Sequence, residues 1–88
     1  PSVVSLSQNY PNPFNPATRI EFALPKESKV TLEVFNLLGE RVIMLVDEVR
    51  SAGYHVTTFN ASSLPSGLYV YRLTADQMTF TRKMMLVK

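Results

Sequence analysis

The 88-residue chain contains no cysteine and no tryptophan, only three glycines and a single histidine. Without cysteine, no disulfide can cross-link the fold and no thiolate can bind a metal, so a hydrophobic core must provide the stability. One histidine alone leaves a zinc site without most of its usual ligands. No apolar run approaches the roughly 20 residues that a membrane-spanning helix needs, so the sequence predicts no transmembrane segment.

The charge is low and unevenly placed. The formal net charge is +2, and residues 1–44 carry equal numbers of cations and anions, so the whole excess lies in residues 45–88. Three of the cations fall in the last seven residues. A nucleic-acid-binding protein normally has a larger basic patch with aromatic side chains interleaved for stacking. We therefore expect no nucleic-acid partner.

Residue types that could support catalysis are present but lack a positioning motif. His55 could be combined on paper with Ser62 or Ser66 and with Asp47 or Asp76, but no nucleophile elbow accompanies them. Glycine-rich phosphate-binding motifs are absent as well. The sequence predicts no catalytic residue, no bound metal and no cofactor.

A two-residue alternation of apolar and polar side chains runs through most of the chain. It predicts β-strands at residues 19–24, 29–34, 40–46, 54–60, 68–73 and 78–87, with residues 47–52 as a polar loop. Asn36 and Gly39 stand at the first and fourth positions of a type I turn that closes a hairpin, which gives Gly39 a structural role. With 45% hydrophobic residues and this length, we expect one domain over residues 1–88.

The first 16 residues form a proline-rich segment that cannot be helical. Pro11, Pro13 and Pro16 restrict both themselves and the residues before them. Two large aromatic residues, Tyr10 and Phe14, lie in the same stretch. A solvated linker rarely contains aromatics at this density, so we expect both rings to clamp the segment onto the domain.

A short pattern near the C-terminus narrows the fold class. The stretch SGLYVY at residues 66–71 has the form of strand F in immunoglobulin domains. Tyr69 would be the tyrosine-corner residue, with its hydroxyl bonded to upstream backbone, and Tyr71 would occupy the place of the disulfide cysteine. The sequence thus predicts an all-β, immunoglobulin-like antiparallel β-sandwich of about seven strands.

The last seven residues, RKMMLVK, are apolar between cations. A terminal strand at a sheet edge can be recognised by strand addition, whereas flanking lysines also protect an edge from aggregation. The sequence leaves packing and recognition equally open here.

Five stretches resemble, in order, the type A C-terminal sorting domains of the type IX (Por) secretion system. They are LSQNYPNPFNPAT at residues 6–18, VFNLLGERV at 34–42, GYHVTTFN at 53–60, LPSGLYVYRL at 64–73 and RKMMLVK at 82–88. Thr57, Thr58 and Asn60 depart slightly from the more apolar and acidic residues usual there. The related immunoglobulin-like domain of flagellar hook-cap proteins shares some of these patterns.

The resemblance implies a module at the C-terminus of a larger protein of a Gram-negative bacterium, secreted or placed on the cell surface through the periplasm. Its implied partners are an N-terminal passenger domain, the type IX machinery and a sortase-like cysteine peptidase, which would cut before Leu6. The residues it implies for recognition are Gly67, Tyr69, Tyr71, Arg72, Lys83, Met84, Leu86 and Lys88. The turn, proline and strand patterns described above predict structural roles for Pro11, Pro13, Phe14, Gly39 and Tyr69.

Two alternatives to a sorting signal remain at this point. A retained immunoglobulin-like module could stabilise or space a neighbouring catalytic domain of a secreted enzyme. Carbohydrate binding by surface aromatics such as Tyr54 or Phe80 is less favoured, because aromatic residues in strands usually belong to the core.

Overall fold

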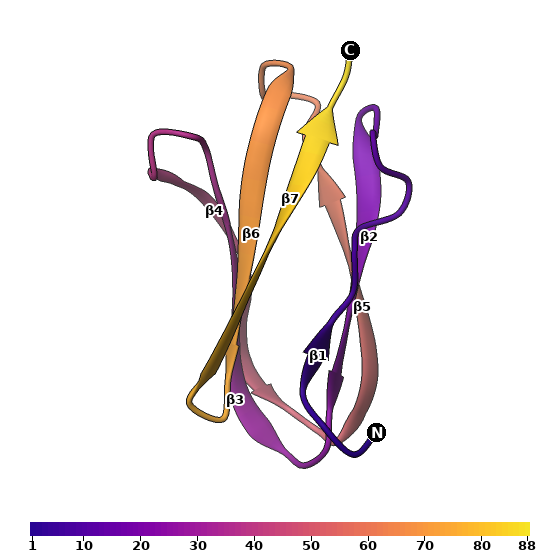
Figure 1. Ribbon diagram of the computed structural model, residues 1–88, viewed down its shortest axis with the longest axis vertical. Helices are drawn as coiled ribbons and strands as arrows, with labels where there is room; N and C mark the ends of the chain where they lie inside the picture. Colours follow the sequence, from indigo (N-terminus) through magenta and orange to yellow (C-terminus); the bar gives the residue numbers. More distant parts are fainter.

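Each apolar run with a two-residue period forms a strand in the computed structural model, which describes residues 1–88 (Figure 1). The seven strands are β1 (Ser5–Leu6), β2 (Ala17–Leu24), β3 (Ser28–Phe35), β4 (Arg41–Arg50), β5 (Gly53–Asn60), β6 (Gly67–Ala75) and β7 (Met78–Leu86). There is no helix, and hence none that could cross a bilayer.

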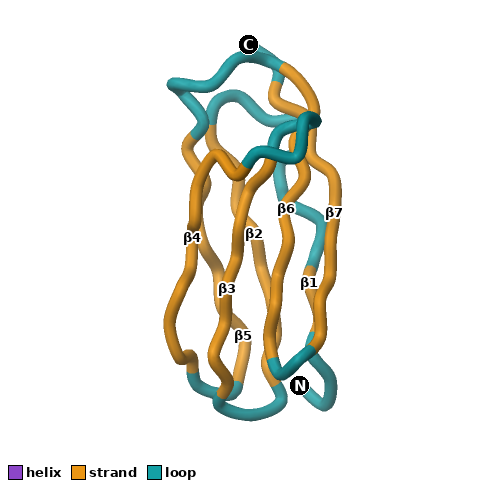
Figure 2. The backbone as a smooth tube through the Cα atoms, turned by 90° about the vertical axis from the view of Figure 1, so that its left-hand side faces the viewer, coloured by secondary structure: helices purple, strands orange, loops and turns teal.

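The strands form two antiparallel sheets that face each other (Figures 1 and 2). The three-stranded sheet has the order β1-β2-β5, and the four-stranded sheet has the order β4-β3-β6-β7. The chain ends lie at opposite ends of the long axis, with the N-terminus beside the start of β1 (Figure 1). The predicted immunoglobulin-like β-sandwich is confirmed.

The core lies between the two sheets and takes mostly alternate side chains from β2, β3, β6 and β7, although Ala23 of β2 is buried as well. Its fully buried members include Ile20, Phe22 and Leu24 of β2, Val30, Leu32 and Val34 of β3, Tyr71 and Leu73 of β6, and Met84 and Leu86 of β7. This is the burial that strict alternation produces when one face of each sheet is covered.

The β3–β4 hairpin is held by the side chain of Asn36. Its Oδ1 accepts hydrogen bonds from the backbone N–H groups of Leu38 and Glu40, both at 3.0 Å. Gly39 has φ of +83°, a conformation that other residues rarely adopt. The two leucines at the tip are exposed, by 66% for Leu37 and 84% for Leu38.

The structure differs from the sequence prediction at residues 47–50 and has the predicted loop only at residues 51–52. Strand β4 continues to Arg50, with Asp47 opposite Thr31 and Arg50 opposite Ser28, so the prediction of a loop from residue 47 was wrong. Charged residues fit a strand here because β4 is an edge strand whose side chains reach water. The Nζ atom of Lys29 also lies 2.9 Å from Oδ1 of Asp47.

Candidate recognition surface

The last strand, β7, forms one edge of the four-stranded sheet. Met84 and Leu86 point into the core and are fully buried, whereas Lys83, Val87 and Lys88 are exposed. The sequence left packing and recognition open for this tail. In the structure Met84 and Leu86 pack in the core, while the side chains of Lys83, Val87 and Lys88 remain accessible.

The edge of β7 is covered by residues 6–14, which we name the N-terminal strap. Four backbone groups of β7 and its extension bond to it. The Lys83 carbonyl accepts from Nε2 of Gln8 at 2.7 Å, and the Met85 N–H donates to Oδ1 of Asn12 at 3.0 Å. The Met85 carbonyl accepts from the Phe14 N–H at 2.9 Å, and the Val87 N–H donates to the Phe14 carbonyl at 3.0 Å. The strap therefore satisfies hydrogen-bonding groups that an edge strand would otherwise leave open.

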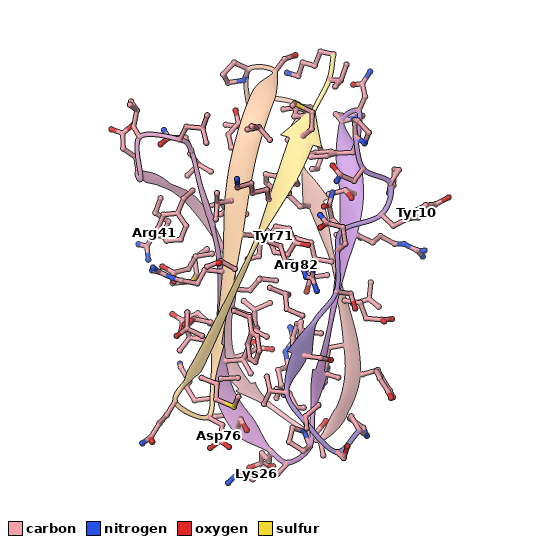
Figure 3. All side chains as sticks on the ribbon, viewed as in Figure 1. Tyr10, Lys26, Arg41, Tyr71, Asp76 and Arg82 are labelled. Atoms are coloured by element: carbon pink, nitrogen blue, oxygen red, sulfur yellow. The ribbon has the colours of Figure 1, made fainter.

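The strap is fastened to the four-stranded sheet by the buried Tyr71 of β6 and the exposed Arg82 of β7 (Figure 3). The Tyr71 hydroxyl donates to the Ser7 carbonyl at 2.7 Å and accepts from the Asn9 N–H at 2.8 Å. Nε of Arg82 donates to the Leu6 carbonyl at 2.6 Å. Burial raises the pKa of Tyr71, although the Asn9 N–H and the charge of Arg82 act in the opposite direction.

Asn9 connects the strap to the three-stranded sheet. Its Nδ2 donates to Oγ1 of Thr18 at 3.0 Å and to the Pro11 carbonyl at 3.2 Å, and the Thr18 hydroxyl donates to the same carbonyl at 2.8 Å. Asn9 and Thr18 are both buried. No buried side-chain nitrogen or oxygen in the molecule lacks a partner, so this polar cluster carries no unpaired group.

The two aromatic residues of the strap have different surroundings. Phe14 is only 2% exposed, and its ring centroid lies 6.0 Å from that of Phe59. Tyr10 is 72% exposed and points away from the sandwich (Figure 3), so the expected clamping role is wrong for this ring. The reason is register: Tyr10 pairs with Arg19, whose side chain lies on the outer face of β2. Pro11 and Pro13 are exposed at the turns of the strap.

The structure divides the residues predicted for recognition into two groups. Tyr69, Tyr71, Met84 and Leu86 are buried, while Gly67 and Arg72 are half-buried and Lys83 and Lys88 are exposed. Of this set, a partner of the folded domain can therefore touch only the backbone of Gly67 and the side chains of Arg72, Lys83 and Lys88. Their role in recognition stays a prediction.

The exposed cations differ in how far they are already engaged. The Arg72 guanidinium lies 3.2 Å from a Glu33 carboxylate oxygen and 4.5 Å from the centre of the Phe35 ring. Nζ of Lys88 donates to the Ser62 carbonyl at 2.8 Å. Lys83 has no ionic partner within 4 Å. Lys83 is consequently the member of the set most available to an anionic group.

Tyr69 and Gly67 shape the start of β6. The Tyr69 hydroxyl donates to the Pro65 carbonyl at 2.7 Å, which is the hydrogen bond of a tyrosine corner. Gly67 has φ of +151°, within the range that favours glycine. Both residues fix the turn that leads into the strand next to β7.

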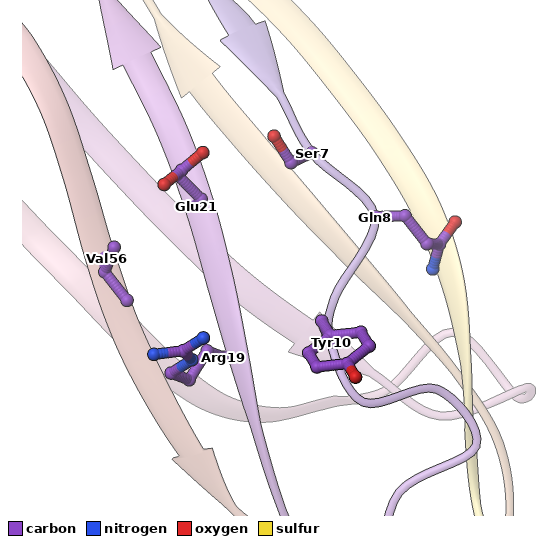
Figure 4. Close-up of a pocket in the computed structure, with 6 residues that line it drawn as sticks. All are labelled: Ser7, Gln8, Tyr10, Arg19, Glu21 and Val56. Carbon is purple, nitrogen blue, oxygen red and sulfur yellow. The ribbon is translucent and has the colours of Figure 1, made fainter.

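A shallow hollow of about 290 Å³ lies on the outer face of the three-stranded sheet (Figure 4). Its lining residues are Ser7, Gln8, Tyr10, Arg19, Glu21 and Val56. It holds one carboxylate and one guanidinium, whereas acid–base pairs of the glycosidase type need two carboxyl groups.

The residues considered for a catalytic triad are engaged elsewhere. The His55 ring stacks on Phe22 at 5.2 Å, and its Nε2 lies 2.8 Å from the Ser51 carbonyl. Asp47 and Asp76 form ion pairs with lysines, and the Ser66 hydroxyl accepts from the Lys88 N–H. No three histidine, cysteine, aspartate or glutamate side chains gather in one place. The features that stand out are thus the last strand and its strap.

Comparison with known families adds an independent finding. The family model described as "Secretion system C-terminal sorting domain" matches residues 8–88. No curated protein matches the chain. The matched region begins at Gln8, the first side chain that bonds to the edge of β7, and includes all of β7.

Proposed function

The chain belongs to the secretion system C-terminal sorting domain family, and on this premise we propose that it is the part of a larger protein that the type IX machinery recognises. The family match supports a type IX sorting signal and thus export to the outside or to the cell surface. The proposal adds that a passenger domain precedes the chain and that the machinery contacts the exposed side chains around β7. The observation that carries it is the match over residues 8–88, which includes residues 8–14 of the strap and the whole last strand.

The pattern of β7 supports a contact through its exposed side chains. Met84 and Leu86 are committed to the core, so an intact domain offers Lys83 and Lys88 from this strand and its extension. A cation without an ionic partner at such a position favours a partner that presents carboxylates, because charge complementarity speeds encounter and fixes register. Lys83 meets that description.

We further propose that a sortase-like cysteine peptidase cuts before Leu6. The support is the change in how firmly the chain is held on either side of that residue. Residues 1–5 are attached through the buried side chain of Val4 and the pairing of Ser5 with Ala23. From Leu6 onward, bonds from Arg82 and Tyr71 fasten the chain to the interior. A cut before Leu6 therefore takes from the sandwich only the core side chain of Val4 and the pairing of Ser5.

A reporter protein with a signal peptide, followed by these 88 residues, tests the sorting role in a bacterium that has type IX secretion. We expect the reporter in the medium or on the surface; its retention in the periplasm overturns the proposal. Deleting residues 83–88 is a poor test, because it removes Met84 and Leu86 from the core. The double variant Lys83→Gln/Lys88→Gln removes charge and leaves both core residues in place.

Arg19→Gln is the matched control for the charge test, because Arg19 is an exposed cation on the opposite sheet and has no ionic partner. If recognition uses the cations of the tail, export falls in the lysine variant and not in the control, with equal unfolding midpoints. Equal export of both variants contradicts the role of these two lysines and leaves the sorting role to the first experiment.

The alternative of a retained spacer makes the opposite prediction for the mature protein. The mass of the secreted protein would then include all 88 residues, and their removal would lower the melting temperature of the neighbouring domain. A mature protein that ends before Leu6 contradicts retention.

A further inference from the structure

The outer edge of β7 has a covered part and an open part. Between residues 83 and 87, the strap satisfies four backbone groups. Thr79 and Thr81, which share the backbone orientation of Lys83 and Met85, have no strand beside them. The covered part includes the apolar run at the end of the chain, residues 84–87, and the open part does not.

The strap imitates a parallel strand incompletely. Phe14 pairs with Leu86 in parallel and supplies both its N–H and its carbonyl, as a regular strand residue does. In a regular parallel strand, the backbone N–H and carbonyl of residue 12 would bond to the Lys83 carbonyl and the Met85 N–H. The side chains of Gln8 and Asn12 take these two bonds instead.

The prolines explain why side chains are needed. Pro11, Pro13 and Pro16 have no backbone N–H, and the turns that they impose take the main chain of the strap away from β7 on either side of Phe14. The bonds from Gln8 and Asn12 are exposed to water. Polar side chains at an exposed edge give up their bonds at a small cost, because water replaces them. The buried Phe14 ring, in contrast, leaves its site only when another large apolar side chain takes its place. A segment without proline could supply all four bonds from its backbone.

We propose that the strap is a displaceable cover over a strand-addition site on β7, whose partner is an extended segment that runs parallel to residues 83–87. The segment places a large apolar side chain where the Phe14 ring now lies beside Phe59. In this mode main-chain hydrogen bonds give affinity and the side-chain pocket gives selectivity. The inference rests on the proposed function only in assigning the segment to the export machinery; the site itself belongs to the domain alone.

A peptide probe tests the site in the full 88-residue chain. The probe is a seven-residue capped peptide of alternating threonine and valine with phenylalanine at its centre, and its control carries alanine there. The receptor is the double variant Gln8→Ala/Asn12→Ala, which removes the two side-chain bonds to β7 and retains Phe14. Asn15→Ala is the control, since Asn15 directly follows the strap, is exposed and makes no side-chain hydrogen bond.

We expect the double variant to bind the phenylalanine peptide about fivefold more tightly than the unaltered chain or Asn15→Ala, as the loss of two competing, water-exposed hydrogen bonds implies. Amide NMR signals of Met85 and Val87 should shift, and the alanine peptide should bind more weakly. Shifts confined to Thr79 and Thr81, or no binding to a variant that is folded, overturn the proposal.

Hydrogen exchange on the unaltered chain provides a measurement that needs no variant. If the strap opens by itself, the amides of Met85 and Val87 exchange faster than that of Leu32 in the central strand β3, although they are hydrogen-bonded. If the amides of Met85, Val87 and Leu32 all exchange at the rate set by global unfolding, the strap does not open by itself and the proposed displaceable cover is contradicted. Because both measurements use the purified domain, their failure is distinct from a failure of the export experiment.

Discussion

The four-stranded sheet has two edges that are protected in different ways. On one side, β4 has no neighbour and carries Asp47, Glu48 and Arg50 in its exposed second half. Two register shifts against β3 also interrupt the regularity of its pairing. Charges and bulges on an edge strand prevent another chain from adding to it. On the other side, β7 ends in the run MMLV and has no such residues at positions 84–87.

The strap protects the edge of β7 against strand addition, whereas charged side chains and register shifts protect the edge of β4. The apolar end of β7 has a physical cover, which residues 6–14 provide through Phe14 and the amide side chains. The apolar first half of β4, residues 42–46, has no cover and lies opposite the two register shifts of β3. Charges on an edge strand oppose strand addition at all times, whereas a covered edge is closed only while its cover is in place. The tail can therefore be kept from aggregation and still be available to one partner.

Removing the Phe14 ring should have the largest effect on this difference between the edges. Phe14→Ala deletes a ring that is 98% buried against the core, and such changes cost about 3–5 kcal/mol in the free energy of unfolding. Urea unfolding measures the loss. Hydrogen exchange should show Met85 and Val87 losing protection relative to the amides between β3 and β4.

Tyr10→Ala is the control for that prediction, because Tyr10 belongs to the same strap and is 72% exposed. Its effect should stay within about 0.5 kcal/mol. If Phe14→Ala and Tyr10→Ala lower the free energy of unfolding equally, the strap is not fastened through Phe14. The proposed difference between the edges of β7 and β4 is then wrong.

The hydroxyl of Tyr71 should have the next largest effect. Tyr71→Phe leaves the Ser7 carbonyl and the Asn9 N–H without their buried partner, which costs about 1–3 kcal/mol. In Tyr71→Phe, the amides of Met85 and Val87 should exchange faster, and the amides between β3 and β4 should keep their protection. Tyr69→Phe is a useful comparison, since it removes one hydrogen bond, to Pro65, outside the strap. A larger loss for Tyr69→Phe in unfolding experiments contradicts the special position of Tyr71.

Alkaline pH should weaken the same fastening in the unaltered chain. Burial raises the pKa of Tyr71 above the value of about 10 for a free tyrosine, so the fold favours the neutral phenol. This contribution to stability is complete below pH 10 and is lost as the pH rises through the pKa of the folded state. Unfolding free energies measured across this range should fall less steeply for Tyr71→Phe than for the unaltered chain. Tyr10→Phe should retain the full decline; identical slopes in all three proteins refute the assignment.

The sequence predicts the strands well where one face of each is buried, because alternation is then forced by packing. Ile20, Phe22 and Leu24 give β2, and Val30, Leu32 and Val34 give β3. The prediction of strands from this alternation fails at residues 47–50, because the side chains of an exposed edge strand need not be apolar. It also gives no sign of the two-residue strand β1, which exists only through pairing with β2.

The strap is the part of the candidate site that local patterns cannot show. The bond between Tyr71 and Ser7 joins residues 64 positions apart, and that between Gln8 and Lys83 joins residues 75 apart. One signal in the sequence points toward it: Gln8, Asn9 and Asn12 are side chains that can replace peptide groups in a stretch whose prolines lack N–H donors. That signal indicates a covered edge without identifying which edge.

The smallest effect on unfolding, and the sharpest test of the comparison, comes from making β4 apolar. Asp47→Val/Glu48→Val removes two exposed charges from an edge strand, at a cost within about 0.5 kcal/mol for each position. Light scattering should nevertheless show concentration-dependent association, because β4 has no strap to cover it. Glu21→Val is the control, since β2 lies between β1 and β5 and offers no free edge. If the double variant stays monomeric while Glu21→Val associates, exposed apolar faces rather than open edges govern association, and the role assigned to the charges of β4 is wrong.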